Sequence, residues 1–210
     1  TLANWLLPII EANQQSYKNG ELRLDNPDYW VLYTMEAMAI SPEKLDAGLV
    51  CFYLFNIVHL KEGEGIFQDA GVPHAYLRGQ NVELMACSDN VIRGGLTPKY
   101  VDIVELLKIV DCREVTPQII SAAPQNQSEF TYKTPVNDFA LDQIRVEPEK
   151  HTKVNLQSAG ILLVMQGELK IQEKSTALTL KQGESAFITA DSNVEIMSEK
   201  GGYAFLAKLP

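Results

Sequence analysis

Residues 181–187, KQGESAF, give the main evidence for the fold, because they repeat KEGEGIF, residues 61–67, which lies 120 residues earlier. The two copies agree at Lys, Gly, Glu and Phe. A glycine followed by a polar residue and an apolar run is typical of a tight turn that leads into a strand. The repeat therefore indicates two copies of one β architecture. Four matches in seven also arise from turn chemistry alone, and that interpretation stays open.

The region around the second copy consists of short β runs separated by turn residues at regular spacing. They cover residues 130–132, 139–146, 160–165, 169–172, 177–180, 185–188, 194–197 and 203–208. This spacing is typical of an antiparallel sandwich or barrel. We therefore expect residues 130–210 to form a barrel. Because Val194 stands where the first copy has His74, we expect that barrel to be free of metal.

The region around the first copy mixes helices with strands. Residues 1–47 are predicted to be helical, with Asn26 and Pro27 as cap and first turn of a second helix and Ser41 as the start of a third. From Gly48 onward, β-branched and aromatic runs predict strands at 49–60, 65–69 and 81–87. Thr97 and Pro98 are expected to cap a helix that continues to Val110, since apolar residues there keep a helical period.

Residues 113–129 lack periodicity and are rich in Pro, Gln, Ser and Asn, which favours a linker. The predicted organisation is a helical segment (1–47), part of a first barrel with its closing helix (48–112), the linker (113–129) and a second barrel (130–210). The fold class is mainly β, with jelly-roll-type barrels, an N-terminal helical segment and an additional helix between the barrels.

Composition narrows the class of partner. The 210-residue chain carries 18 basic and 27 acidic residues, a net charge of −9, and its scattered Lys and Arg argue against nucleic acid. The longest apolar run, Leu49–Phe55, is far shorter than the roughly 18 residues of a membrane span. No basic residue precedes Lys18 to form a secretory signal, and three cysteines without a Cys-x-x-Cys pair favour buried thiols in a reducing cytoplasm. A small ligand is the expected partner.

Only three histidines are available to bind a metal: His59, His74 and His151. A catalytic zinc needs at least three protein ligands. His59 ends a predicted strand and His151 lies in a polar run, so a solvated or packed ring is favoured for both. His74 follows Pro73, and on the residues alone a structural role and a ligand role both stay open.

The surroundings of His74 carry a family resemblance. DAGVPH, residues 69–74, resembles the second motif of cupin barrels, in which a histidine binds metal inside the barrel, on a rigid strand; the corresponding positions of the second copy are Asp191 and Val194. VPHAYL (72–77), ELMACSDN (83–90) and RGGLTPKY (93–100) resemble type I mannose-6-phosphate isomerase, a zinc enzyme of the cupin superfamily. The match is densest between Gly63 and Lys108 and extends over essentially the whole chain.

The resemblance implies roles for five residues. His74 corresponds to a zinc ligand, Arg93 to the catalytic arginine, Glu83 and Lys99 to active-site polar residues, and Tyr76 to the pocket lining. The family's Gln-x-His pair and further Glu ligand belong to its N-terminal part, and no Gln stands two residues before any histidine here. The chain therefore resembles the C-terminal part, and the missing N-terminal part of the same enzyme is an expected partner.

The implied function is the interconversion of mannose 6-phosphate and fructose 6-phosphate by zinc-assisted proton transfer through an enediolate, with this chain supplying part of the site. The alternative is a non-catalytic cupin-like binding module or truncated fragment. Each residue also has a structural interpretation: Glu83 can face solvent, Lys99 can be a surface charge, and Arg93 can pair with Asp89. A Lys in the first helical turn opposes the helix dipole, which favours a ligand for Lys99.

Overall fold

The computed structural model describes residues 1–88 and 90–210, which divide into two compact units. Unit 1 comprises Thr1–His59, Gln68–Asn81 and the segment that ends at Pro117. Unit 2 comprises Leu60–Phe67, Val82–Ser88 and Gln118–Pro210. Each unit has its own cluster of buried apolar side chains. The domain boundaries expected from the sequence stay a prediction.

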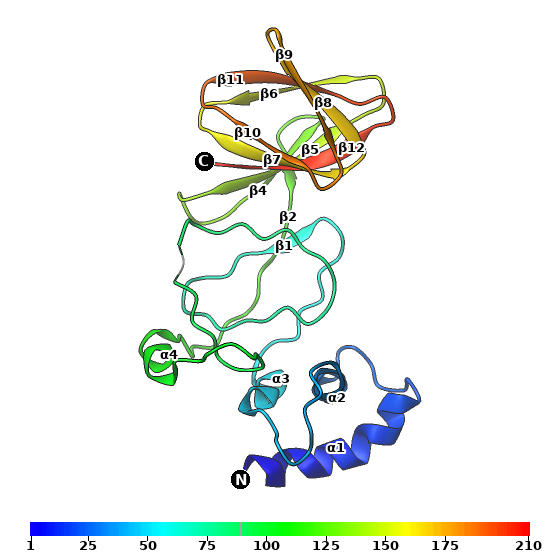
Figure 1. The fold of residues 1–210 in the computed structure, drawn as a ribbon, viewed down its shortest axis with the longest axis vertical. Helices are drawn as coiled ribbons and strands as arrows, with labels where there is room; N and C mark the ends of the chain where they lie inside the picture. Colours follow the sequence, from blue (N-terminus) through cyan, green and yellow to red (C-terminus); the bar gives the residue numbers. More distant parts are fainter. Residues whose placement is uncertain (89) are drawn as a thin grey trace. The chain divides into compact units, whose positions relative to one another are not determined.

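Unit 1 is built on two helices, α1 (Leu2–Lys18) and α2 (Pro27–Ala37), shown in blue in Figure 1. The expected cap of α2 is confirmed, because the Asn26 side chain accepts a hydrogen bond from the Asp28 backbone N–H at 2.9 Å. The core of the unit draws on α1, α2 and the segment that follows them: Leu6, Ile10, Trp30, Val31, Leu32, Met35, Leu49 and Phe52.

The predicted strand over residues 49–60 is wrong. Residues 47–54 are helical instead, as a 3-10 turn η1 (Ala47–Val50) followed by α3 (Cys51–Leu54). Asp46 caps this segment by accepting from the Gly48 backbone N–H at 2.7 Å, and Leu49 and Phe52, three residues apart, are the buried pair. A short apolar run does not distinguish a strand from a buried helical turn, and the core of unit 1 selects the helix.

Two other helix predictions also need correction. Ser41 starts a turn rather than a helix, closed by the Lys44 backbone N–H donating to the Ser41 carbonyl at 3.0 Å. The helix expected from Thr97 begins later, as α4 (Ile103–Ile109), because Asp102 caps it by accepting from the Glu105 backbone N–H at 3.0 Å.

Between Phe67 and Asp102 the described residues form neither helix nor strand, and Figure 1 draws them as loops. The strand predicted at 81–87 is therefore absent from this structure. The strand predicted at 65–69 is reduced to β1 (Glu64–Ile66), which pairs with β2 (Ile119–Ser121) in an antiparallel ladder. The expected linker, 113–129, thus holds β2 and also β3 (Ala123–Pro124).

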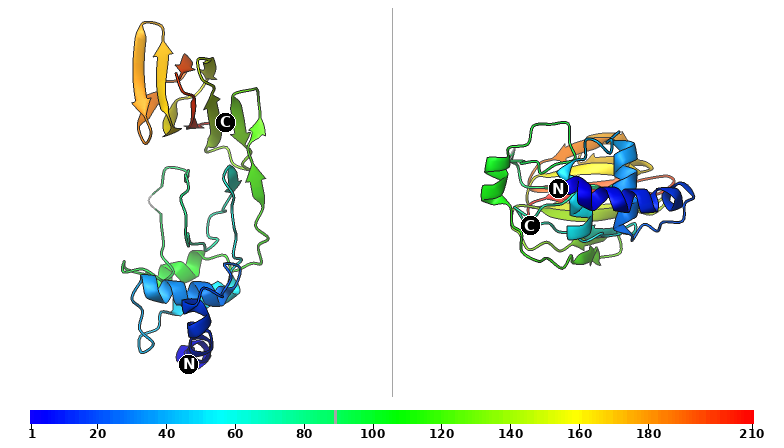
Figure 2. Two further views of the ribbon diagram at one scale, coloured as in Figure 1. Left: turned by 90° about the vertical axis from the view of Figure 1, so that its right-hand side faces the viewer. Right: turned by 90° about the horizontal axis from the view of Figure 1, so that it is seen from below.

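Unit 2 is a sandwich of two antiparallel sheets, visible as layers in Figures 1 and 2. The six-stranded sheet has the order β10-β7-β12-β5-β4-β3 and the four-stranded sheet β6-β11-β8-β9. The strand bounds are β4 Glu129–Tyr132, β5 Ala140–Val146, β6 His151–Leu156, β7 Gly160–Gln166, β8 Glu168–Glu173, β9 Thr176–Lys181, β10 Ser185–Ile188, β11 Ser192–Met197 and β12 Gly202–Lys208.

All eight strands predicted in this region are present, and the structure adds β6. That strand alternates exposed and buried residues, with Thr152, Val154 and Leu156 turned inward. Both sheets contribute alternate residues to one apolar core, as a sandwich requires. The expected mainly β class, with N-terminal helices, is confirmed. None of the described helices has both the length and the apolar character needed to cross a membrane.

Candidate functional site

The repeated heptad forms the same turn twice. In the first copy the Glu64 backbone N–H donates to the Lys61 carbonyl at 3.0 Å, and the Glu64 side chain accepts from the Lys61 backbone N–H at 2.8 Å. In the second copy Glu184 and Lys181 make the same two bonds at 2.9 and 2.8 Å. Gly63 and Gly183 lie at φ +81° and +83°, the left-handed region that the third position of such a turn demands. A strand begins within each copy: β1 at Glu64 and β10 at Ser185.

The correspondence continues eight residues beyond each turn glycine. Gly71 has φ +79° and Asp191 has φ +58°, so both copies reverse the chain at the same place. Three residues later stand His74 and Val194. Val194 lies in β11, between β6 and β8, and is buried in the core of unit 2. Val194 therefore shows that a residue at this position of the repeat points into the core when strands flank it on both sides.

His74 has a different environment. It is exposed, its Nδ1 lies 3.0 Å from the Val72 carbonyl oxygen, and its ring centroid lies 6.0 Å from that of Tyr76. The rigid strand expected for His74 is wrong in this structure, because no described strand runs alongside residues 72–77. Val194 is buried because its strand, β11, is hydrogen-bonded to a strand on each side, and the His74 segment has no such neighbouring strands among the described residues.

The His74 loop is nevertheless anchored at its base. The Asp111 backbone N–H donates to the Gly71 carbonyl at 2.8 Å, and a side chain at Gly71 would meet the Ile109 carbonyl at 2.7 Å. Arg113 also forms an ion pair with Asp69 at 2.9 Å. The loop is therefore fixed against the end of α4, and a glycine is required at position 71 for both its φ angle and this close approach.

Arg93 precedes a second anchored loop. The side chain of Arg93 is half-buried, and no ion pair holds it within the part of the chain that the structure describes. Gly95 lies against Gly48, and Leu96 packs on the core of unit 1, where Leu77 also packs. The segments that carry His74 and Arg93 thus share one apolar support. Asp89, the alternative partner of Arg93, lies outside the described residues.

The other candidates are more loosely placed. Lys99 is exposed and lies before α4 rather than in its first turn, so the dipole argument for a ligand there is wrong. Its backbone N–H donates to the Thr97 hydroxyl at 3.2 Å. Tyr76 is 62% exposed. Glu83 is exposed and belongs to unit 2, whereas the other four candidates belong to unit 1.

The described residues do not fit a complete zinc site. Among them, no group of three or more His, Cys, Asp or Glu side chains is close enough together to hold a metal ion. A catalytic zinc needs three protein ligands, and His74 supplies one nitrogen. The described residues therefore present a single candidate zinc ligand, His74.

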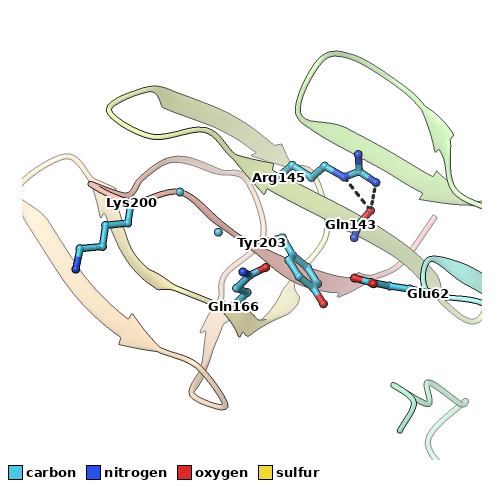
Figure 3. A pocket seen from close by; sticks show the side chains of 8 residues that line it. Glu62, Gln143, Arg145, Gln166, Lys200 and Tyr203 are labelled. Atoms are coloured by element: carbon cyan, nitrogen blue, oxygen red, sulfur yellow. Dashed lines mark hydrogen bonds between the residues drawn. The ribbon is translucent and has the colours of Figure 1, made fainter. Parts of the chain in front are cut away.

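Two cavities on unit 2 lie apart from the candidate residues. The first, about 300 Å³, is lined by Glu62, Gln143, Arg145, Gln166, Lys200, Gly201, Gly202 and Tyr203. Figure 3 shows Lys200 pointing away from the other side chains and Arg145 engaged with Gln143, whose Oε1 accepts at 3.0 and 3.2 Å. The second is lined by residues of β6, β8 and β11 and by Lys174, which follows β8. No sequence motif marks either cavity, so neither is predicted from the sequence.

Comparison with known proteins gives a consistent result. Residues 128–200 match a family model described as mannose-6-phosphate isomerase, cupin domain, which confirms the cupin fold predicted for this region. Mannose-6-phosphate isomerase of Escherichia coli K12 is 43% identical over 150 residues, 70% of this chain and 38% of that protein. The chain thus spans less than half the length of the curated relatives that it matches.

Solved structures agree with the sequence matches. An arginine-to-alanine mutant of phosphomannose isomerase from Salmonella typhimurium superimposes with a TM-score of 0.72 at 30% identity, over 94% of this chain and 49% of that chain. Another structure of the Salmonella typhimurium enzyme, bound to substrate (fructose 6-phosphate) and zinc, gives a TM-score of 0.68 at 30% identity, over 99% of this chain and 60% of that chain.

Proposed function

We infer that the chain belongs to the mannose-6-phosphate isomerases and forms the C-terminal part of such an enzyme. The observation that carries this inference is the 43% identity to the Escherichia coli enzyme over 70% of the chain. The proposed activity is the interconversion of mannose 6-phosphate and fructose 6-phosphate, with this chain supplying one part of the site. The remainder comes from the portion of the enzyme that the match leaves uncovered.

The spacing of the two principal candidates supports this proposal. Two solved structures of the Salmonella typhimurium enzyme carry alanine in place of a histidine and in place of an arginine nineteen residues further along. Nineteen residues also separate His74 from Arg93 in this chain. The pair therefore matches in residue type, order and separation.

The same structures support an incomplete site in this sequence. A histidine, a glutamate and two lysines were replaced in other mutants, and all four lie more than a hundred residues before the substituted histidine. Only 73 residues precede His74 here. Counterparts of those four positions therefore fall outside this sequence, which agrees with the single candidate zinc ligand among the described residues.

The proposed chemistry moves one proton between C2 and C1 of the sugar. Glu83 takes the proton from C2 of the aldose, and the C2–H electrons form the C1=C2 bond of an enediolate with negative charge on O1. The hydroxyl proton then moves from O2 to O1, and the proton held by Glu83 returns to C1, so that C2=O2 forms and the product is the ketose. Arg93 stabilises the developing negative charge on the enediolate oxygens, because its guanidinium is always charged and donates several N–H groups. Lys99 binds the phosphate and Tyr76 lines the sugar pocket.

His74 is proposed as one ligand of the zinc of the complete enzyme. A zinc ion so placed lowers the free energy of negative charge on a substrate oxygen by several kcal/mol. The part played by this chain is to hold the imidazole in place through the anchored Gly71 loop. Flanking strands from the uncovered portion are expected to turn His74 inward, as β6 and β8 do for Val194.

The test uses the enzyme with its complete N-terminal part. His74→Ala is expected to lower both zinc content, measured by mass spectrometry, and conversion of mannose 6-phosphate. Arg93→Ala is expected to lower turnover by about a hundredfold or more while zinc content stays near one per chain.

Matched controls come from the second barrel. His151→Ala and Arg145→Ala remove exposed side chains of the same types from β6 and β5, and both variants should keep metal and activity. Normal metal occupancy in the His74 variant would remove His74 from the ligand set. A complete protein that neither binds zinc nor converts the sugar would favour the alternative, a non-catalytic cupin-like binding module.

A further inference from the structure

One arginine, Arg113, joins two carboxylates at the base of the loop that carries His74. Its Nη2 lies 2.9 Å from an Asp69 carboxylate oxygen, and its Nε lies 3.0 Å from an Asp111 carboxylate oxygen. The other Asp111 oxygen accepts a hydrogen bond from the Arg113 backbone N–H at 3.0 Å. A planar guanidinium holds two such partners in a fixed geometry. Arg113 therefore ties the start of the His74 loop to the segment after α4.

A backbone contact restrains the same turn. The Asp111 N–H donates to the Gly71 carbonyl at 2.8 Å, two residues beyond the Asp69 carboxylate. The Arg113 and Asp69 side chains are 56% and 57% exposed, and exposed ion pairs contribute little to the free energy of unfolding. The arrangement therefore suits a role in fixing geometry better than a role in stability.

Hydrogen bonds connect Asp69 with the imidazole of His74. The Val72 N–H donates to the Asp69 carbonyl at 3.4 Å, and the Val72 carbonyl oxygen lies 3.0 Å from His74 Nδ1. Because a carbonyl oxygen can only accept, Nδ1 carries the proton of the neutral ring and the lone pair is on Nε2. A metal-binding histidine commonly makes such a bond with its other ring nitrogen, which sets the orientation and tautomer of the ring.

We propose that Arg113 is a positioning residue for His74. By holding Asp69 against Asp111, it keeps the Val72 carbonyl within reach of Nδ1 and so presents Nε2 as the atom that binds the metal. The inference rests on the proposed function, in which His74 is a zinc ligand of the complete enzyme, and deepens it. Arg113 opens the segment that the sequence favours as a linker, so no sequence pattern predicts a role for it at the site.

The first test measures the tautomer of His74 in this chain, without metal. The chain has only three histidines, so the nitrogen NMR signals of each ring can be assigned. At about pH 8.5, where neutral imidazole predominates, His74 of the wild type is expected to carry its proton on Nδ1. Arg113→Ala should shift the ring toward the form protonated on Nε2 and leave His59 and His151 unchanged.

The second test measures the zinc dissociation constant of the complete enzyme by competition with a chelator. Arg113→Ala is expected to weaken zinc binding about tenfold, the lower end for loss of a group that orients a ligand. Turnover of mannose 6-phosphate should recover as the zinc concentration is raised. Adding Asp69→Asn to Arg113→Ala should cause no further loss, because the pair is already broken.

Two variants serve as controls. Arg23→Ala breaks another exposed arginine–aspartate pair of unit 1, Arg23–Asp25 at 2.8 Å, between α1 and α2. It should change neither the His74 tautomer nor the zinc dissociation constant. Arg113→Lys keeps the positive charge but not the fork that joins two carboxylates, so it should show an intermediate loss. Circular dichroism checks that each variant remains folded.

An unchanged His74 tautomer or an unchanged zinc dissociation constant in Arg113→Ala would overturn the proposal. An equal loss in Arg23→Ala would also overturn it, because the effect would then belong to unit 1 as a whole. Failure of the proposed function looks different. In that case the complete wild-type enzyme would bind no zinc, or His74→Ala would bind it normally, while the tautomer in this chain would still show whether Arg113 positions the ring.

Discussion

Asp142 is a fully buried carboxylate in β5, and its partners explain why the sandwich tolerates it. The Thr131 hydroxyl donates to one of its oxygens at 2.5 Å, and the Lys208 ammonium contacts the other at 2.5 Å. Burial lowers the pKa of Lys208, but the carboxylates of Asp142 and Glu129 outweigh that effect, so the pKa lies above its ordinary value. The pair ties β12 to β5 near the C-terminus.

Lys208→Met should therefore destabilise unit 2 by about 3 kcal/mol, the lower end for breaking a buried pair, because Lys208 is partly exposed. Urea unfolding followed by circular dichroism measures this change. Adding Asp142→Asn should recover most of the loss, and Lys133→Met, at an exposed lysine, should have little effect.

The raised pKa of Lys208 also makes the stability of unit 2 depend on pH. The stabilisation of unit 2 by the Lys208–Asp142 pair is complete below about pH 10.4 and is lost as the pH rises through the raised pKa. Equal stability of Lys208→Met and wild type would contradict the account.

At the scale of elements, sequence predicts structure best where one local interaction decides the conformation. The Asn26 cap of α2 and the Gly183 turn are of this kind, because the bonds that define them join residues within three positions. Residues 49–54 are the opposite case. Their apolar and aromatic side chains favour a strand, yet Leu49 and Phe52 pack on α1 and α2 from helical positions.

Replacing the cap tests the local interaction directly. Asn26→Ala should lower the free energy of unfolding of unit 1 by about 1 kcal/mol, because the Asp28 N–H loses its acceptor. Fluorescence of Trp30, which lies in α2, follows the transition. Asn26→Asp keeps an acceptor at the helix N-terminus and should remain close to wild type; a loss as large as that of the alanine variant would show that the amide has another role.

At the scale of the molecule, the two apolar cores share no residue. One consists of helical residues of unit 1 and the other of strand residues of unit 2. Both tryptophans, Trp5 and Trp30, lie in α1 and α2, so their fluorescence reports on unit 1, whereas the strand signal in circular dichroism reports mainly on unit 2.

Leu162→Ala, at a fully buried position of β7, should therefore destabilise the strand transition by about 2–5 kcal/mol and leave the tryptophan transition nearly unchanged. Leu6→Ala, at a buried position of α1, should do the reverse. Coincident shifts in both signals for either variant would show that the two cores unfold as one cooperative unit.

Local sequence patterns predict eight of the nine strands of the second barrel, all except β6, together with the α2 cap and both copies of the repeated turn. These depend on alternation, capping and a glycine at positive φ, which act over a few residues. The sequence also marked His74 and Arg93 through their motifs, and their roles stay a prediction. Three features depend instead on tertiary contacts: residues 47–54 are helical, residues 72–77 form no strand, and residues 60–67 lie against Tyr132 of the six-stranded sheet. The reason is physical: strand pairing and burial depend on neighbours distant in sequence, and no local pattern specifies which neighbours a segment will find.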